Sequence, residues 1–143
     1  MSLVTVEMPV QFSGAHKLYP STPHCTLIFL GDLPARRRGV VEDAVARLRM
    51  QVTPLMVPTA GLAVFGRGDH TVIRLQDVVL KTWRTFIEKE LKRDGVVSAS
   101  EWTFNPHVTI NKHTVSSVPI LPFEDFQLPA TVWVDKPTLR WDD

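Results

Sequence analysis

The sequence predicts an α+β fold made of two similar halves, and three observations support this prediction. Two segments place apolar residues at helical spacing, and segments that resemble β-strands lie before, between and after them. The pattern Pro-His-x-Thr occurs twice, at 23–26 and 106–109, once ahead of the first helical segment and once after the second. A chain of 143 residues can bury a core without disulfides or a structural metal, so we expect residues 1–143 to form one domain.

The composition excludes several classes of protein. Hydrophobic residues make up 44% of the chain and charged residues 22%, which are ordinary values for a globular protein. No apolar run approaches the ~20 residues that cross a bilayer, and residues 1–12 lack the features of a signal peptide. The single cysteine, Cys25, allows neither an internal disulfide nor a zinc-binding CxxC pair. We therefore expect a cytoplasmic protein that does not bind membranes.

The net charge of +1 argues against a protein that grips long duplex DNA by neutralising its phosphates. Small or short anionic ligands remain compatible with this charge.

The first half is predicted to contain a strand and a helix. Residues 25–31 (CTLIFLG) are typical of a strand, and the turn signal Gly-Asp-Leu-Pro at 31–34 follows. Residues 37–51 predict an amphipathic helix, because four apolar residues recur there at helical spacing: Val41, Ala44, Val45 and Leu48.

A hairpin is predicted next, with strands at 53–66 and 71–76. The Gly-Asp pair between them favours a tight turn, which would leave His70 in solvent. Phe65 is expected to fill the core.

The second half begins with a helix at 77–95. Basic residues occupy its last turn, Gly95 is a typical stop, and five residues fall on one apolar face: Val79, Trp83, Phe86, Ile87 and Leu91. Trp83 is therefore expected to pack in the core and not to contact a ligand. The rest of the chain predicts short strands, at 107–113, 122–128 and 131–141.

The repeated motif predicts a catalytic site. Residues i and i+2 of a strand share a face, so His24 lies with Thr26 and His107 with Thr109, while the intervening Cys25 and Val108 point into the core. Two facing histidines can supply one base and one acid at neutral pH, and threonine hydroxyls can donate to the oxygens of a phosphate as charge builds on them. Hydrolysis or transesterification of a phosphodiester needs this combination, and it needs neither a metal nor another cofactor.

No metal ligands are expected. Four carboxylates lack the grouping with histidine that a metal site requires: Asp69, Glu101, Asp125 and Asp135.

The two motifs resemble the signatures of the 2H phosphoesterase superfamily, which includes RNA 2',3'-cyclic phosphodiesterases. The first signature is His-x-Thr-Leu-x-Phe-Leu-Gly, and PHCTLIFLG matches it at His24, Thr26, Leu27, Phe29, Leu30 and Gly31. The second is His-x-Thr-hydrophobic-x-basic, and PHVTINK is similar to it at His107, Thr109, Ile110 and Lys112.

This resemblance implies a bilobal α+β fold, with two antiparallel sheets related by pseudo-two-fold symmetry around a central groove and helices outside. It also implies metal-independent phosphodiesterase (hydrolase) activity, in which His24 and His107 are general acid and base and Thr26 and Thr109 bind phosphate oxygens. Lys112 would replace the arginine that the superfamily often has, although a lysine cannot bind phosphate bidentately.

The substrate expected from this reading is a short or cyclic nucleotide. Nucleotide recognition usually adds aromatic faces for base stacking, and Tyr19 and Trp141 are the preferred candidates. Superfamily branches include viral enzymes that degrade cyclic nucleotide immune signals, and a compact chain is compatible with that role.

Two alternatives stay open. The substrate could instead be the 2',3'-cyclic phosphate end of an RNA, or the chain could be a non-catalytic module that only binds nucleotides. The residues do not assign which histidine begins as base, nor the oligomeric state.

Overall fold

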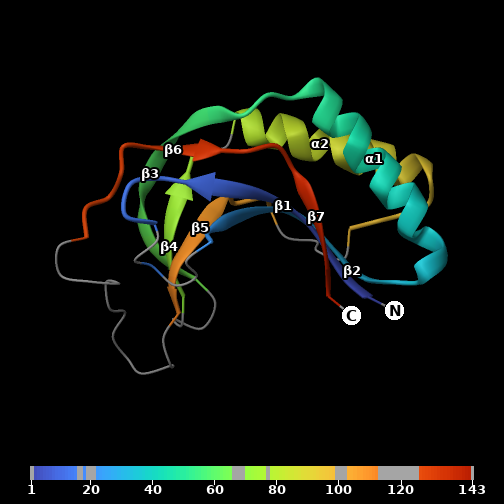
Figure 1. Cartoon of the computed structure of the whole chain (residues 1–143), viewed down its shortest axis with the longest axis horizontal. Coiled ribbons are helices and arrows are strands. Elements are labelled where there is room, and N and C mark those ends of the chain that lie inside the picture. The colour runs from blue at the N-terminus through green and yellow to red at the C-terminus, as the bar shows by residue number, and fades with distance from the viewer. Residues whose placement is uncertain are drawn as a thin grey trace.

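The fold is a curved antiparallel sheet with two helices, seen in the computed structural model of Figure 1. The structure describes residues 2–15, 18, 22–65, 70–76, 78–98, 103–112 and 126–142. Their elements are, in order, β1 (Ser2–Gln11), β2 (His24–Leu33), η2 (Ala35–Arg37), α1 (Arg38–Gln51), β3 (Leu55–Phe65), β4 (His70–Leu75), α2 (Val78–Arg93), β5 (His107–Lys112), β6 (Thr131–Val134) and β7 (Thr138–Asp142).

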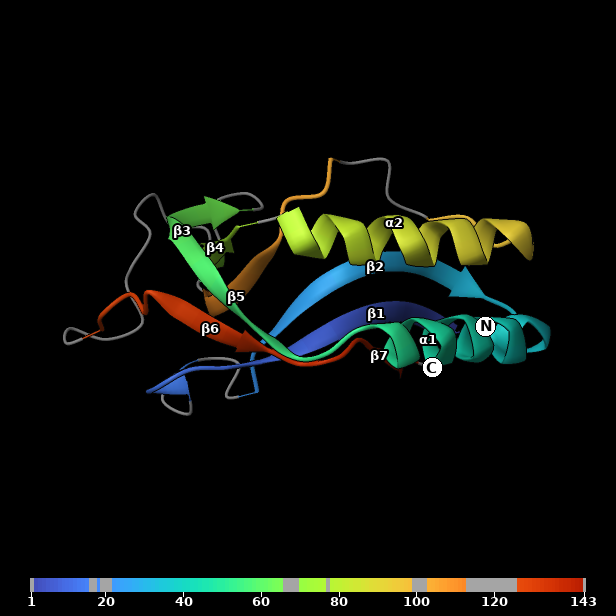
Figure 2. The same ribbon diagram turned by 90° about the horizontal axis from the view of Figure 1, so that it is seen from above.

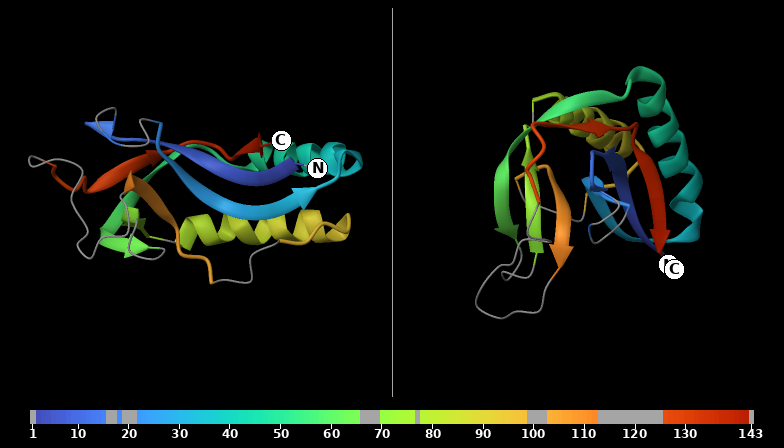
Figure 3. Two further views of the ribbon diagram at one scale, coloured as in Figure 1. Left: turned by 90° about the horizontal axis from the view of Figure 1, so that it is seen from below. Right: turned by 60° about the vertical axis from the view of Figure 1, so that its left-hand side comes forward.

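The strand order brings the two motif strands together. The strand order of the sheet is β2-β5-β4-β3-β6-β1-β7. Because β2 also pairs with β1, the strands from β2 to β1 in this order form a closed ring of pairings. Strand β2 pairs with β5 although the two come from opposite halves of the chain. Strands β1 and β7 pair from Leu3 with Asp142, which places the beginning and the end of the chain side by side (Figure 3).

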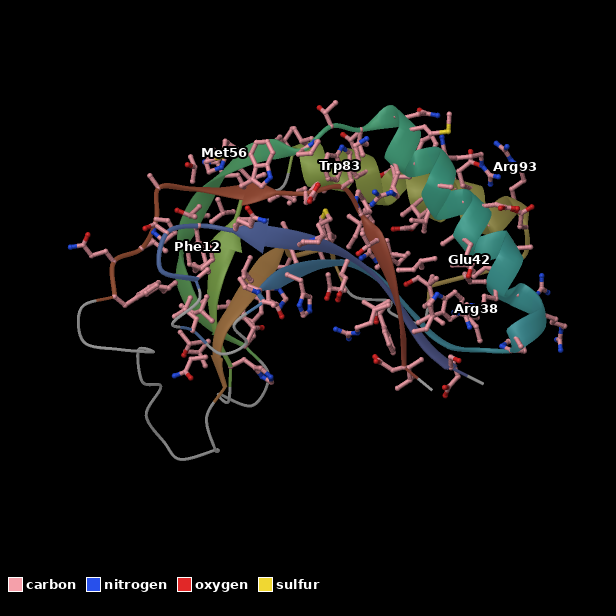
Figure 4. All side chains as sticks on the ribbon, in the orientation of Figure 1. Phe12, Arg38, Glu42, Met56, Trp83 and Arg93 are labelled. Atoms are coloured by element: carbon pink, nitrogen blue, oxygen red, sulfur yellow. The ribbon has the colours of Figure 1, made fainter. Side chains whose placement is uncertain are left out.

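The helices cover one face of the sheet, and the core lies between (Figures 1 and 2). The buried residues of α1 are the four that its spacing predicted: Val41, Ala44, Val45 and Leu48. In α2 the prediction was wrong at Val79, which is exposed, because the helix turns Leu80 inward instead. Trp83 of α2 is almost fully buried (Figure 4).

Strand β1 was not predicted, although it is the strand with most neighbours. It pairs with β2, β6 and β7, and its buried apolar residues alternate as a strand requires: Val4, Val6, Met8 and Val10. Thr5, between the first two, is buried as well. The predicted strand at 131–141 is two strands, because Pro137 lies between them and has no N–H for a ladder. Residues 126–129 form no strand, and the rest of the segment predicted at 122–128 lies outside the described residues.

Strand β2 is bulged against β1, which alters the simple alternation expected of it. The pairings Thr5↔Phe29 and Glu7↔Thr26 are each offset from the preceding ones by an extra residue on β2. Leu27 and Ile28 are consequently both buried, while Thr26 and Phe29 are both exposed. The Arg84 side chain of α2 donates to the Leu27 carbonyl at 2.9 Å, so the bulge is also tied to the helix layer.

Within the part of the chain that the structure describes, neither helix has the length and hydropathy needed to span a membrane.

Candidate active site

The two His-x-Thr motifs lie side by side on one face of the sheet. Cys25 of β2 pairs with Val108 of β5, and both side chains are fully buried on the helix-covered face. Continuing this antiparallel pairing by one residue in each direction places His24 opposite Thr109, and Thr26 opposite His107. Each histidine therefore has the threonine of the other motif as its cross-strand neighbour, on the face away from the helices.

His107 is held as a neutral imidazole with one defined tautomer. Its Nδ1 lies 2.8 Å from the Asn105 carbonyl oxygen, which can only accept, so Nδ1 carries the proton and Nε2 keeps its lone pair. Burial lowers the pKa of His107 below its usual 6.5, the Asn105 carbonyl opposes this shift, and the charges of His70 and His24 lower the pKa further. The ring is thus a free base at neutral pH.

His70 belongs to this site, and the prediction that it lies in a turn was wrong. It is the first residue of β4, pairs with Phe65 and Lys112, and is only partly exposed. Phe65, which was expected in the core, instead lies edge-on to the His107 ring with 4.5 Å between centroids. Both residues come from the β3–β4 hairpin, whose alternation turns them toward the same face.

His24 has a carboxylate beside it that the sequence analysis missed. Its Nε2 lies 3.3 Å from Oε2 of Glu7, on β1. The same oxygen lies 3.1 Å from an Arg140 amino group of β7, and Arg140 Nε bonds Asp142 at 3.1 Å. The sequence of β1 could have identified Glu7, because it is a carboxylate between two apolar residues, Val6 and Met8.

The described residues also include a basic side chain on this face that was not predicted. Arg74 of β4 pairs directly with His107, so their side chains share a face at neighbouring positions. Arg74 is exposed, and among the described residues its guanidinium makes no hydrogen bond or ion pair. By contrast, Arg140 is already paired with two carboxylates. Arg74 is therefore available to an anion bound beside the histidines.

Of the three predicted substrate-binding residues, Trp141 is the one whose side chain the structure describes. Lys112 ends β5, where its backbone pairs with His70, and its side chain lies outside what the structure describes. Tyr19 also lies outside the described residues. Trp141 pairs with the fully buried Val4, so it faces the helix layer, where Arg38 lies 4.5 Å from its ring centroid. Figure 4 marks Arg38 on α1, and the fold does not bring Trp141 to the histidines.

Among the described residues, no three or more His, Cys, Asp and Glu side chains are grouped in a way that could hold a metal ion.

Comparison with known proteins shows a similarity in sequence to a phosphodiesterase. No family model matches the chain. An RNA 2',3'-cyclic phosphodiesterase of Geobacillus stearothermophilus is 30% identical over 118 residues, which cover 75% of this chain and 35% of that protein. The chain therefore spans about a third of the length of the relative that it matches.

Solved structures share the fold at lower identity. The MHV ns2 PDE domain has a TM-score of 0.63 and 19% identity, over 94% of this chain and 99% of that one. Escherichia coli LigT in complex with 3'-AMP has a TM-score of 0.62 and 16% identity, over 97% of this chain and 87% of that one. LigT has also been solved with NADP+. These neighbours confirm the predicted fold class of antiparallel strands with outer helices.

Proposed function

We propose that the chain is a member of the 2H phosphoesterase superfamily and a phosphodiesterase acting on short or cyclic nucleotides, with His24 and His107 as its acid and base. The observation that carries the proposal is the pairing of β2 with β5, which sets the two His-x-Thr motifs next to each other on one face. The proposed catalytic unit is the single domain of residues 1–143, and the proposed compartment is the cytoplasm, where a lone buried thiol such as Cys25 is common.

The environments of the two histidines support different roles. His107 has a lowered pKa and a proton fixed on Nδ1, so its Nε2 takes the proton of the attacking water or ribose hydroxyl. The attacking oxygen forms a bond to phosphorus, the bond from phosphorus to the leaving oxygen breaks, and His24 gives that oxygen a proton. The Thr26 and Thr109 hydroxyls donate to the non-bridging oxygens as their charge grows.

Basic side chains complete the proposed phosphate site. Arg74 is exposed, unpaired among the described residues and adjacent to His107, so its guanidinium can meet a phosphate that lies between the histidines. Lys112, on the same strand as His107, is retained as a second basic contact.

The finer proposal for the substrate is a cyclic (oligo)nucleotide, including those that serve as immune signals degraded by viral enzymes. The similarity of the fold to the MHV ns2 PDE domain supports this choice. The name of the Geobacillus relative favours a second candidate, the 2',3'-cyclic phosphate end of an RNA. That substrate needs only the hydrolytic step, because its cyclic phosphate has already been formed.

The test is a turnover assay in EDTA with four substrate classes: cyclic dinucleotides, cyclic trinucleotides, 2'-5' oligoadenylate and an RNA that ends in a 2',3'-cyclic phosphate. Cleavage that survives chelation supports the proposal, and the preferred substrate separates the two candidates. Binding of nucleotides without any turnover would instead favour a non-catalytic module. Arg74→Ala should raise KM for the preferred substrate. Arg36→Ala should not, because Arg36 is an exposed arginine of η2, beyond the end of β2 opposite to His24.

The acidic limb of the kcat/KM profile should have its midpoint below pH 6.5. This profile reports the free enzyme, in which the base His107 must be neutral. Because its pKa is lowered, His107 stays neutral as the pH falls through 6.5, and activity is lost only as the pH falls through that lowered pKa. Phe65→Ala, which exposes the ring, should move the midpoint up toward 6.5. A wild-type midpoint at or above 6.5 would contradict the assignment of His107 as base.

A further inference from the structure

The two motif strands share little backbone pairing with each other. Strand β2 pairs with β1 along its whole length, and β5 pairs with β4 along its whole length. Between β2 and β5, the described residues form one pair, Cys25↔Val108. Each motif is therefore held firmly by its own neighbouring strand, while the spacing between the two motifs depends on further contacts.

Helix α2 supplies contacts to β2 where β5 no longer accompanies it. The helix runs alongside β2 (Figure 2), and Arg84 donates from Nη1 to the Leu27 carbonyl at 2.9 Å. Leu27 directly follows Thr26 and is the bulged residue, which has no partner on β1. After the end of the helix, Ser98 donates from Oγ to the Phe29 carbonyl at 3.2 Å. The helix side therefore fixes the backbone of β2 immediately after the first motif.

The same guanidinium reaches the segment that leads into the second motif. Cζ of Arg84 lies 5.2 Å from the centroid of the Phe104 ring, within the range of a cation–π interaction. Phe104 precedes Asn105, whose carbonyl oxygen lies 2.8 Å from Nδ1 of His107. One side chain thus contacts both of the segments that carry the motifs.

The position of Arg84 is itself well defined. Its side chain is only 14% exposed, and its Nε donates to Oε1 of Glu88, one turn further along α2, at 2.7 Å. The planar guanidinium can use its Nε edge, an Nη group and its face at the same time, which a lysine ammonium cannot. A cation that is largely removed from water and has three partners is held in one place.

We propose that Arg84 is a positioning residue for both His-x-Thr motifs: its guanidinium, in contact with the Leu27 carbonyl and the Phe104 ring, holds the two motif strands at the spacing that the reaction needs. The inference rests on the proposed function, in which the two histidines and two threonines act on one phosphate. Because Arg84 lies on the helix side of the sheet, it acts through the backbone of the motifs and not on the substrate.

The main variant is Arg84→Met, which keeps an unbranched side chain but removes the donors and the charge. We expect kcat to fall about 10–100-fold, since a small misplacement of reacting groups costs this much, with KM little changed. Arg84→Lys keeps the charge and one donor for the Leu27 carbonyl, so its kcat should fall less.

Two controls separate positioning from stability. Arg47→Met makes the same change in α1 and removes an ion pair of 3.0 Å with Glu90 of α2. Leu91→Ala removes buried apolar contacts about two turns beyond Arg84 on the same helix. Thermal unfolding ranks the stability of the variants, and kcat is measured well below every midpoint. Both controls should keep the kcat of the wild type under these conditions.

Backbone hydrogen exchange gives a readout that does not depend on activity. In Arg84→Met, exchange should accelerate in residues 24–28 and 105–109 more than in residues 41–48 of α1, because the junction of the motif strands opens locally. In Leu91→Ala, exchange in α1 should rise at least as much as in the motif segments, because stability is lost throughout.

The outcomes separate this inference from the proposed function. An unchanged kcat in Arg84→Met, an unchanged exchange at both motif segments, or an equal fall of kcat in Leu91→Ala would each overturn the role of Arg84. If Arg84→Met does not fold, Arg84→Lys is judged by the same criteria. If the wild type turns over none of the four substrate classes, the proposed function fails, and hydrogen exchange still decides whether Arg84 holds the motifs together.

Discussion

Replacing either His24 or His107 with alanine is expected to lower kcat about 10²–10⁴-fold on the preferred substrate. Each variant removes one of the two proton transfers that the mechanism requires, while the threonines and the basic side chains can still bind the phosphate. The double variant should be little slower than the slower single one, since the two groups act as a unit. Steady-state kinetics in EDTA, with kcat and KM measured separately, tests this expectation.

Asp32→Ala is the control for these variants, because Asp32 is an exposed residue at the far end of the same strand as His24. Its kcat should equal that of the wild type. Turnover that survives in both histidine variants at the wild-type rate would rule out the two-histidine mechanism.

Replacing Trp83 with alanine should lower the free energy of unfolding by about 3–5 kcal/mol, the usual cost of truncating a buried aromatic side chain. Trp83 is 6% exposed and belongs to the face of α2 that packs in the core. The loss is large against the roughly 5–15 kcal/mol that stabilises a typical domain. Urea denaturation of the wild type and of Trp83→Ala, fitted with the same m-value, measures the difference in the free energy of unfolding.

Trp133→Ala supplies the comparison, since Trp133 is 37% exposed on β6. Its truncation should cost clearly less, because less apolar surface returns to water. Equal losses for Trp83 and Trp133 would show that the burial of Trp83 does not set its contribution.

The sequence was most informative where a pattern is local. Helical spacing identified all four buried residues of α1, since a helix repeats within a few residues and needs no distant partner to define its face. At the start of α2 the same spacing fits both Val79 and Leu80 as neighbours of Trp83, and Leu80 is the one that is buried. Strand β1 shows the opposite case, because its place in the sheet depends on three partner strands, and β2, β6 and β7 are not determined by the residues of β1 itself.

The bulges of β2 mark another limit of local reasoning. Alternation alone predicts that Thr26 and Ile28 share a face, yet Ile28 is buried and Phe29 is exposed. The change depends on the register against β1, which is set by tertiary packing and cannot be derived from β2 itself.

The amino-acid sequence by itself determined the two His-x-Thr motifs, the alternation of side chains within each motif and the α+β class, because each follows from residue type and a period of 2 or 3.6. Only the tertiary structure decided which side chains surround the histidines. Glu7, His70 and Arg74 reach them through pairings between strands, and these pairings join residues that lie far apart in the sequence. The physical reason is that hydrogen-bonded register and burial, which set the neighbours and the pKa of a catalytic ring, exist only once the sheet has formed.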